Sequence, residues 1–364
     1  MNTRRKVKRR KLKLVFYSGP VRPHDIVNEA TPPPRTQARP SSTVLSLPFR
    51  QLQEPSPVDH PSALLRPEPA YATPFGAMVC GDAATAMAAL PTDSVDLVVT
   101  SPPYALHFKK EYGNADKAAY VEWFRPFAVQ MYRMLKPDGS FVLNIGGSYN
   151  PGAPTRSLYH FRLLLMLCDE VGFHLAQECF WYNPAKLPSP AEWVNVRRIR
   201  IKDSVEYVWW LSKTAHQKAD NRQVLEEYSD DMRRLLRRGY RAKKRPSGHN
   251  ITNKFSRDHG GAIPSNVLAR GNNESNSEYL RLCEEFGQQP HPARFPAALP
   301  EFYIKFLTRP GDLIVDPFAG SNTAGAVAER LQRRWLSFEV EQKYVENSRL
   351  RFGLARDTTS CFRA

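Results

Sequence analysis

Short apolar runs alternate with longer amphipathic stretches along two parts of the chain, residues 71–213 and 291–352. Stretches such as 118–135 and 158–171 carry apolar residues at helical spacing. Strands that alternate with helices are typical of a mostly parallel sheet that is covered on both faces. The pattern therefore predicts an α/β fold with a seven-stranded, mostly parallel sheet. Its predicted strands are 77–80, 94–100, 140–145, 174–182, 205–211, 313–315 and 335–340.

The segment 214–290 interrupts this pattern, because it is polar, rich in Asn, Ser, Gly and Arg, and has few strand signals. Within it, residues 233–245 hold eight Lys and Arg and no acidic residue. We interpret it as a smaller module inserted between two halves of the core, 71–213 and 291–352. Residues 353–364 then form a C-terminal tail.

Residues 1–70 have the composition of a tail. They hold twelve of the 31 prolines and thirteen Lys and Arg against five Asp and Glu, without sustained periodicity. Such a segment buries too little apolar area to offset its ordering entropy, so we predict disorder. Its basic cluster, residues 4–13, is either a nonspecific nucleic-acid contact, a solvated tail or the product of an over-extended translation start.

The net charge of +16 indicates a polyanionic partner, most often nucleic acid. No apolar run approaches the ~20 residues of a membrane span, and no signal peptide is recognised. The five cysteines lack CxxC spacing, which predicts neither disulfides nor a cysteine-based zinc site and indicates a reducing cytoplasm. The histidines show no HExxH spacing, and we expect no metal.

The buried strand that ends at Thr100 leads directly into Ser101, Pro102, Pro103 and Tyr104. Ligands of open α/β sheets bind beyond the carboxyl ends of strands, and two prolines make this loop rigid. A serine hydroxyl and a prolyl carbonyl accept hydrogen bonds, while a tyrosine offers a flat face. The loop suits a planar heteroaromatic amine. An ordinary turn after a strand is the alternative.

A second buried strand, residues 312–316, leads into a turn of small residues and then into a helix. Such a turn lets a ligand approach the backbone N–H groups closely. The next strand places Glu339 where it can accept ribose hydroxyls, and Asp82 ends another strand near an adenine amino group or in an ordinary turn. The turn matches no phosphate-binding fingerprint, so the set predicts a nucleoside without phosphates. Its candidate residues are Asp316, Pro317, Phe318, Ala319, Gly320, Ser321, Asn322 and Thr323.

The sequences SPPY at 101–104 and DPFAGS at 316–321 resemble the catalytic and cofactor motifs of DNA methyltransferases that methylate amino groups with S-adenosylmethionine. Serine in the first position is typical of the N4-cytosine branch, whereas the N6-adenine branch usually has aspartate. The order of catalytic motif, recognition region and cofactor motif is that of the β class. The resemblance covers residues 75–352 and implies the Rossmann-like fold of methyltransferases that use S-adenosylmethionine. It is strongest, over segments such as 186–195 and 291–302, to members that modify the palindrome CAGCTG.

The resemblance implies a role for each matching residue. Ser101, Pro102, Pro103 and Tyr104 would bind and activate the base, while the DPFAGS turn cradles the cofactor. Glu339 would take its ribose and Asp82 its adenine. His291 and Phe295 match the motif that holds the methionine moiety, although His291 could equally cap a helix. Trp181 and Tyr182 would line the pocket of a flipped-out base, with packing on the sheet as the alternative.

The basic residues of the inserted segment are predicted to bind duplex DNA, although a solvated basic helix face is an alternative. The resemblance further implies a monomer in the bacterial cytoplasm, associated with the nucleoid. Its role would be protection of DNA in a restriction-modification system, with a cognate endonuclease acting on the same site without direct contact. The predicted DNA-binding residues are Arg233, Arg234, Arg237, Arg238, Arg241, Lys243, Lys244, Arg245 and His249.

Three other functions fit parts of the sequence. An N6-adenine methyltransferase would share the fold and cofactor, but Ser101 argues against it. A catalytically inactive DNA-binding module would not need SPPY, DPFAGS and Glu339 together. Methylation of RNA is disfavoured by the large inserted segment.

Overall fold

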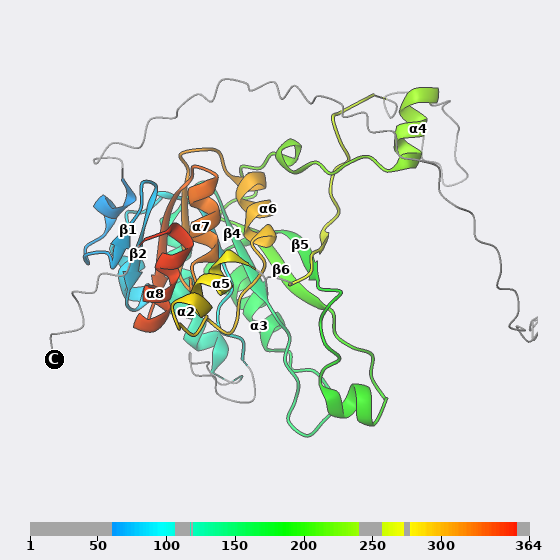
Figure 1. Ribbon diagram of the computed structural model, residues 1–364, viewed down its shortest axis with the longest axis horizontal. Coiled ribbons are helices and arrows are strands. Elements are labelled where there is room, and N and C mark those ends of the chain that lie inside the picture. Colours follow the sequence, from blue (N-terminus) through cyan, green and yellow to red (C-terminus); the bar gives the residue numbers. More distant parts are fainter. Residues whose placement is uncertain (1–59, 106–116, 118, 240–256, 273–276, 355–364) are drawn as a thin grey trace, which may run out of the picture. The chain divides into compact units, whose positions relative to one another are not determined.

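The computed structural model describes residues 60–105, 117, 119–239, 257–272 and 277–354, which belong to one compact unit, Gln53–Ala364. These residues form one nine-stranded sheet with the order β1-β2-β9-β8-β3-β4-β6-β5-β7 (Figure 1). Five of its eight strand pairs are parallel. The strands are β1 (Tyr71–Ala72), β2 (Gly76–Cys80), β3 (Val95–Thr100), β4 (Leu135–Ile145), β5 (His174–Tyr182), β6 (Val205–Ser212), β7 (Val267–Ala269), β8 (Leu313–Asp316) and β9 (Arg334–Glu339).

The predicted α/β fold with a mostly parallel sheet is confirmed, and every predicted strand overlaps an observed one. The count of seven was too low because β1 and β7 have only two and three residues, too few to show a period. Strand β7 lies in the segment interpreted as an inserted module, yet it pairs in parallel with β5. The recognition segment therefore contributes a strand to the central sheet.

Two apolar clusters lie on opposite faces of the sheet. In β3, Val98 belongs to the cluster under helices α1, α2 and α3, whereas Leu97 and Val99 belong to the cluster under α6, α7 and α8. Burial on both faces explains why β3 has three consecutive apolar residues, 97–99, rather than alternating apolar and polar ones. The helices are α1 (Ala83–Ala88), α2 (Tyr120–Met134), α3 (Tyr159–Leu165), α4 (Asp230–Arg238), α5 (Glu278–Glu285), α6 (Ala298–Leu307), α7 (Thr323–Arg330) and α8 (Gln342–Ser348).

Shorter helical turns complete the described structure. They are the 3₁₀ turns η1 (Pro61–Leu64), η4 (Asn221–Val224) and η7 (Arg349–Phe352), and the π-helical turns η2 (Met166–Val171) and η3 (Glu192–Val196). Among the described residues, no helix is both long and apolar enough to cross a membrane.

Residues 60–70 were assigned to the tail, and here the structure corrects the boundary. His60 caps η1 by accepting a hydrogen bond from the Ser62 N–H, and Leu64 and Leu65 pack against the core. The few apolar residues of this stretch show no period because a single turn is too short to show one. Residues 1–59 lie outside the described residues, and the division of the remaining chain into 71–213, 214–290, 291–352 and 353–364 stays a prediction.

The site is positioned by the neighbouring parallel strands β3 and β8. The chain continues from β8 to β9 on one side and from β3 to β4 on the other. The two connections thus diverge above the pair, which is the arrangement that opens a ligand crevice at the carboxyl ends of strands.

Candidate functional site

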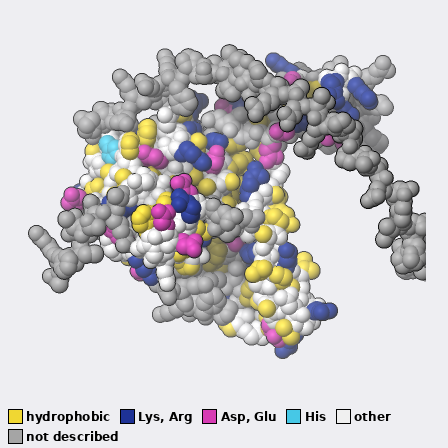
Figure 2. Space-filling model, viewed as in Figure 1, with side chains coloured by type: hydrophobic (Ala, Val, Ile, Leu, Met, Phe, Trp, Pro, Cys, Tyr) yellow, Lys and Arg dark blue, Asp and Glu magenta, His cyan; other side chains and the backbone are white. Residues whose placement is uncertain are grey.

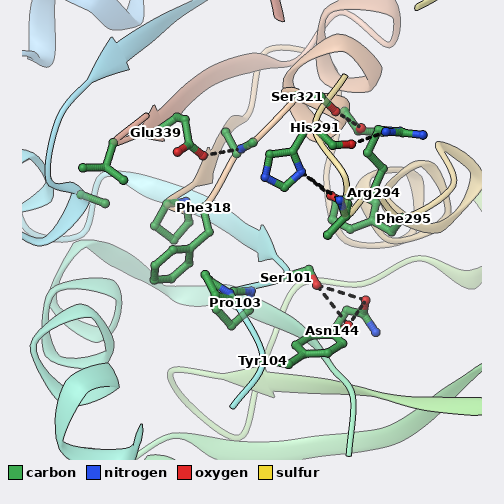
Figure 3. Close-up of a pocket in the computed structure, with 18 of the residues that line it drawn as sticks. Ser101, Pro103, Tyr104, Asn144, His291, Arg294, Phe295, Phe318, Ser321 and Glu339 are labelled. Atoms are coloured by element: carbon green, nitrogen blue, oxygen red, sulfur yellow. Dashed lines mark hydrogen bonds between the residues drawn. The ribbon is translucent and has the colours of Figure 1, made fainter. Parts of the chain in front are cut away.

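A cavity of about 620 Å³ lies at the carboxyl ends of β3 and β8. It brings together the two predicted motifs, which are more than 200 residues apart in the sequence (Figure 3). Figure 3 shows Ser321 and Glu339 at one end of the cavity and Ser101 and Tyr104 at the other. The predicted residues that line it are Asp82, Ser101, Pro102, Pro103, Tyr104, Trp181, His291, Phe295, Pro317, Phe318, Ala319, Gly320, Ser321, Thr323 and Glu339.

The loop after β3 is held from two sides. The Tyr120 hydroxyl of α2 donates a hydrogen bond to the Pro103 carbonyl at 2.8 Å. The ring of Tyr104 lies against the backbone of Gly146, where an added Cβ would stand 2.5 Å from a ring carbon. Only glycine leaves room for this approach, so the ring has a fixed position at the cavity wall.

Two polar side chains of the sheet, Glu206 and Asn144, bond to Tyr104 and Ser101. The Tyr104 hydroxyl donates to the Glu206 carboxylate at 2.7 Å, and Asn144 Oδ1 lies 3.3 Å from Ser101 Oγ. Lys186 forms an ion pair of 2.9 Å with the other carboxylate oxygen of Glu206. Burial, and next to it the Glu206 charge, raise the pKa of Tyr104 well above its ordinary value. Tyr104 is therefore a protonated donor at neutral pH.

Asp316 lies beneath the cofactor turn rather than in it. Its carboxyl is buried and accepts hydrogen bonds from Thr100 Oγ1 at 2.6 Å and from the Phe318 N–H at 3.1 Å. Burial raises its pKa to about 7, although both hydrogen bonds oppose the shift. Asp316 does not line the cavity, and its hydrogen bonds to Thr100 and Phe318 place it as a support of the turn. Its predicted contact with the cofactor stays a prediction.

Asn322 was also predicted to touch the cofactor, and its side chain likewise forms its hydrogen bonds inside the protein. It adopts a left-handed conformation (φ 57°), is fully buried, and caps α7 by accepting from the Gly325 N–H at 3.1 Å. Its amide also donates to the Tyr71 hydroxyl and accepts from Ser337 Oγ. Because these bonds direct the side chain into the protein, it does not reach the cavity.

Glu339 is oriented by backbone donors at the edge of the cavity. One carboxylate oxygen accepts from the Gly320 N–H at 2.8 Å, and the other accepts from the Glu341 N–H at 2.9 Å. Burial raises the pKa of this carboxyl. A carboxylate offers about four acceptor directions, so the two that remain can receive the hydroxyls of a ribose. Asp82 caps α1 nearby and also lines the cavity.

His291 packs beside the turn and does not begin a helix. Its ring is nine-tenths buried, meets the Tyr344 ring at 4.3 Å and shares a hydrogen bond with the Ala293 carbonyl. Burial lowers the pKa of His291 to about 4, so the imidazole is neutral at pH 7. The ring fills the space that a Cβ at Gly320 would enter, since that atom would lie 3.2 Å away.

The two aromatic residues predicted to line the base pocket, Trp181 and Tyr182, lie in different environments at the end of β5. Trp181 is buried, lines the cavity and donates to the Arg270 carbonyl at 2.8 Å. Tyr182 is 37% exposed and does not line the cavity. Successive residues of a strand point to opposite faces, so the structure places Trp181 at the cavity and Tyr182 away from it, and a role of Tyr182 in the base pocket stays a prediction.

Several residues that line the cavity were not predicted from the sequence. Trp123 and Phe127 of α2 pack around Phe318, with ring centroids 5.7 and 4.8 Å from it, and form an aromatic wall. Asn144 follows the same strand-end rule as Ser101 and could have been found. Glu206 could not, because it lies near the start of β6, which is antiparallel to β4. Arg294 and Asn272 are further lining residues outside the predicted set.

Of the predicted DNA-binding residues, the structure describes the four arginines on α4. Ser229 caps this helix, and its Arg side chains gather on its surface (Figure 2). Arg233 pairs with Glu227 and Arg234 with Asp231, while Arg237 and Arg238 are exposed. The predicted residues that lie outside the described ones are Arg241, Lys243, Lys244, Arg245 and His249.

No group of three His, Cys, Asp or Glu side chains in the described ranges is arranged to hold a metal ion. The sheet and the cavity at its switch point define the Rossmann-like methyltransferase class. Comparisons with known proteins define the family within this class.

The sequence model of the N6_N4_Mtase family, described as DNA methylase, matches residues 95–349. The chain is 53% identical over 288 residues to the type II methyltransferase M.PvuII of Proteus hauseri, covering 78% of this chain and 86% of that protein. It is 26% identical to M.BglII of Bacillus subtilis, covering 73% and 66% of the two chains. The solved structure of PvuII DNA methyltransferase (cytosine-N4-specific) superimposes with a TM-score of 0.66 and 47% identity, covering 80% and 91%. The chain therefore belongs to the DNA methylase family.

Proposed function

We propose that this protein transfers a methyl group from S-adenosylmethionine to the exocyclic N4 of a cytosine in duplex DNA, within the sequence CAGCTG. The observation that carries the proposal is the meeting of the Ser101–Tyr104 loop and the 316–323 turn in one cavity. One end of that cavity suits a nucleoside and the other suits a planar amine. The likeness to a cytosine-N4-specific enzyme supports the choice of base. The resemblance of segments such as 186–195 and 291–302 to family members that modify CAGCTG supports this target sequence.

The chemistry of the lining residues fits S-adenosylmethionine, whose sulfonium supplies an electrophilic methyl group. Glu339 would hold the ribose hydroxyls, and Asp82 would meet the adenine amino group. The aromatic wall of Trp123, Phe127 and Phe318 gives an apolar surface beside them. The turn at Gly320 brings the backbone close to the ligand without crowding it.

The target base must leave the duplex to reach this cavity, because the chemistry takes place at a buried pocket. Ser101 Oγ and the Pro102 carbonyl would accept its two amino hydrogens, while Tyr104 and Trp181 would bound its ring. These contacts favour a pyramidal nitrogen whose lone pair faces the methyl group. Catalysis then rests on position and hydrogen bonding, without a covalent intermediate. None of the five cysteines follows a proline, as the nucleophile of C5-cytosine methylation usually does.

The basic residues on α4 and after it would neutralise DNA phosphates and hold the duplex over the cavity. We place the protein in the bacterial cytoplasm on the nucleoid, acting as a monomer on one strand at a time. Its role would be protection of DNA from an endonuclease that cuts the same site. Methylation of adenine N6 is the second candidate, disfavoured by Ser101.

The test is nucleoside mass spectrometry of plasmid DNA treated with the purified protein and S-adenosylmethionine, with strand-resolved sequencing of the same sample. N4-methylcytosine inside CAGCTG is the expected result. N4-methylcytosine in another sequence would overturn the target, and N6-methyladenine would overturn the assignment of the base. Recovery of no methylated base would overturn the proposed reaction.

A further inference from the structure

Glu206 is a carboxylate in the base-binding end of the cavity that the proposed reaction has not used. Its side chain is 15% exposed and accepts the Tyr104 proton at 2.7 Å. Lys186 occupies its other oxygen at 2.9 Å and compensates its charge. Burying a carboxylate here costs desolvation energy, so we looked for a function that explains its position.

The contacts around Tyr104 determine which atoms donate. A phenol has one proton, and the short bond to an ionised carboxylate is the strongest available to it. The Tyr104 oxygen is then an acceptor toward Ser101 Oγ, which lies 3.3 Å away. Burial, with the Glu206 charge next, keeps the pKa of Tyr104 high and the phenol protonated.

Asn144 completes the arrangement from the other side. Its amide nitrogen donates to the Tyr207 carbonyl at 3.2 Å, so its Oδ1 faces Ser101 and accepts. Both protein neighbours of the Ser101 hydroxyl, Tyr104 and Asn144, are thus acceptors. The Ser101 proton is engaged with one of them, and the lone pairs of its Oγ stay available to an amino group.

We propose that Glu206 is a positioning residue that acts through Tyr104 to keep Ser101 as a hydrogen-bond acceptor toward the target amino group. The inference rests on the proposed function, because it concerns the amine bound at Ser101. The amino hydrogens become more acidic as the nitrogen is methylated, so the bond to Ser101 strengthens in the transition state. Loss of the acceptor therefore lowers the rate of methyl transfer more than it weakens binding.

Lys186 makes Glu206→Gln a sharp test. An ammonium only donates, so it draws the Gln carbonyl oxygen and turns the amide nitrogen toward Tyr104. Tyr104 must then accept from Gln and donate its own proton toward Ser101 or Asn144. The substitution reverses the hydrogen bonds with almost no change in shape.

The experiment measures single-turnover methyl transfer to unmethylated plasmid DNA, together with the Kd values for S-adenosylmethionine and DNA. We expect Glu206→Gln to slow transfer roughly tenfold to a hundredfold, with both Kd values within about threefold of wild type. In a Tyr104→Phe background the same change should cost less than about threefold, because the hydroxyl through which it acts is gone. Glu178→Gln, on the exposed side of the same β5–β6 hairpin, is the matched control.

A second variant tests the direction of the hydrogen bonds. In Lys186→Met with Glu206→Gln, the amide is free to turn its oxygen toward Tyr104, and we expect at least about fivefold recovery over Glu206→Gln alone. Transfer by Glu206→Gln within twofold of wild type, multiplicative losses with Tyr104→Phe, or no recovery with Lys186→Met would each overturn the proposal. A wild-type protein that forms no N4-methylcytosine would instead overturn the proposed function.

Discussion

Thr100 Oγ1 donates a hydrogen bond of 2.6 Å to Asp316 Oδ1, joining the last residues of β3 and β8 across 216 positions of sequence. The Ser101–Tyr104 loop begins directly after Thr100, and the cofactor turn continues directly after Asp316. Both partners are buried. Together with the parallel pairing of β3 and β8, this bond holds the two halves of the site next to each other.

The buried Asp316 carboxyl should make stability depend on pH. Its pKa of about 7 in the folded protein lies above the ordinary value of 3.8, so folding favours the protonated form. The associated stabilisation is full below pH about 4 and is lost as the pH rises through about 7, by at most about 4 kcal/mol. Urea unfolding at pH 5 and pH 8 should show a larger difference for wild type than for Asp316→Asn. Equal differences would contradict the assignment.

Ser101→Ala should slow methyl transfer at least tenfold, since loss of one acceptor costs about 2–4 kcal/mol of transition-state stabilisation. The Ser101 hydroxyl forms its hydrogen bonds with Tyr104 and Asn144 rather than with the cofactor turn, so the Kd for S-adenosylmethionine should be unchanged by calorimetry. An unaltered single-turnover rate would rule out the role of Ser101.

Glu339→Gln should raise the Kd for S-adenosylmethionine about tenfold or more, because an amide cannot accept from both the Gly320 and Glu341 N–H groups and still serve a ribose. Calorimetry measures this directly. Glu341→Gln, whose side chain does not line the cavity, is the control. If the two variants bind equally well, Glu339 does not hold the ribose.

Gly146→Ala should displace the Tyr104 ring, because the new Cβ would stand 2.5 Å from it. We expect methyl transfer to fall roughly tenfold or more while S-adenosylmethionine still binds, as the turn at 316–323 is remote from this contact. A crystal structure of the variant with an unmoved Tyr104 ring would contradict the expectation.

Arg237→Gln with Arg238→Gln should weaken DNA binding without sequence preference. If each arginine neutralises one phosphate, the slope of log K against log salt should fall in magnitude by about 1.8 in total. Fluorescence anisotropy with duplexes that contain or lack CAGCTG measures both effects. The pairing of Arg233 and Arg234 with acidic neighbours predicts a smaller effect for those two. An unchanged slope would remove α4 from the DNA-binding surface.

The sequence determined the sheet and both motif loops. Strands such as β3 and β8 are buried on both faces, so each contains a run of apolar residues, 97–99 and 313–315, that can be recognised in the sequence. The loops that follow these strands can be recognised by their proline and small residues, because the effects of these residues on the backbone are also local. For that reason nearly all of the predicted base-binding and cofactor residues line one cavity.

Tertiary structure decided what depends on the direction of a side chain or on partners far along the chain. Asp316 and Asn322 belong to the right motif yet turn inward, because Thr100, Tyr71 and Ser337 satisfy them there. Glu206 reaches Tyr104 only because β6 runs antiparallel to β4. The start of β6 therefore lies beside the carboxyl end of β4, where the cavity is. A sequence records which groups are present, but hydrogen bonds across the sheet decide which of them face the ligand.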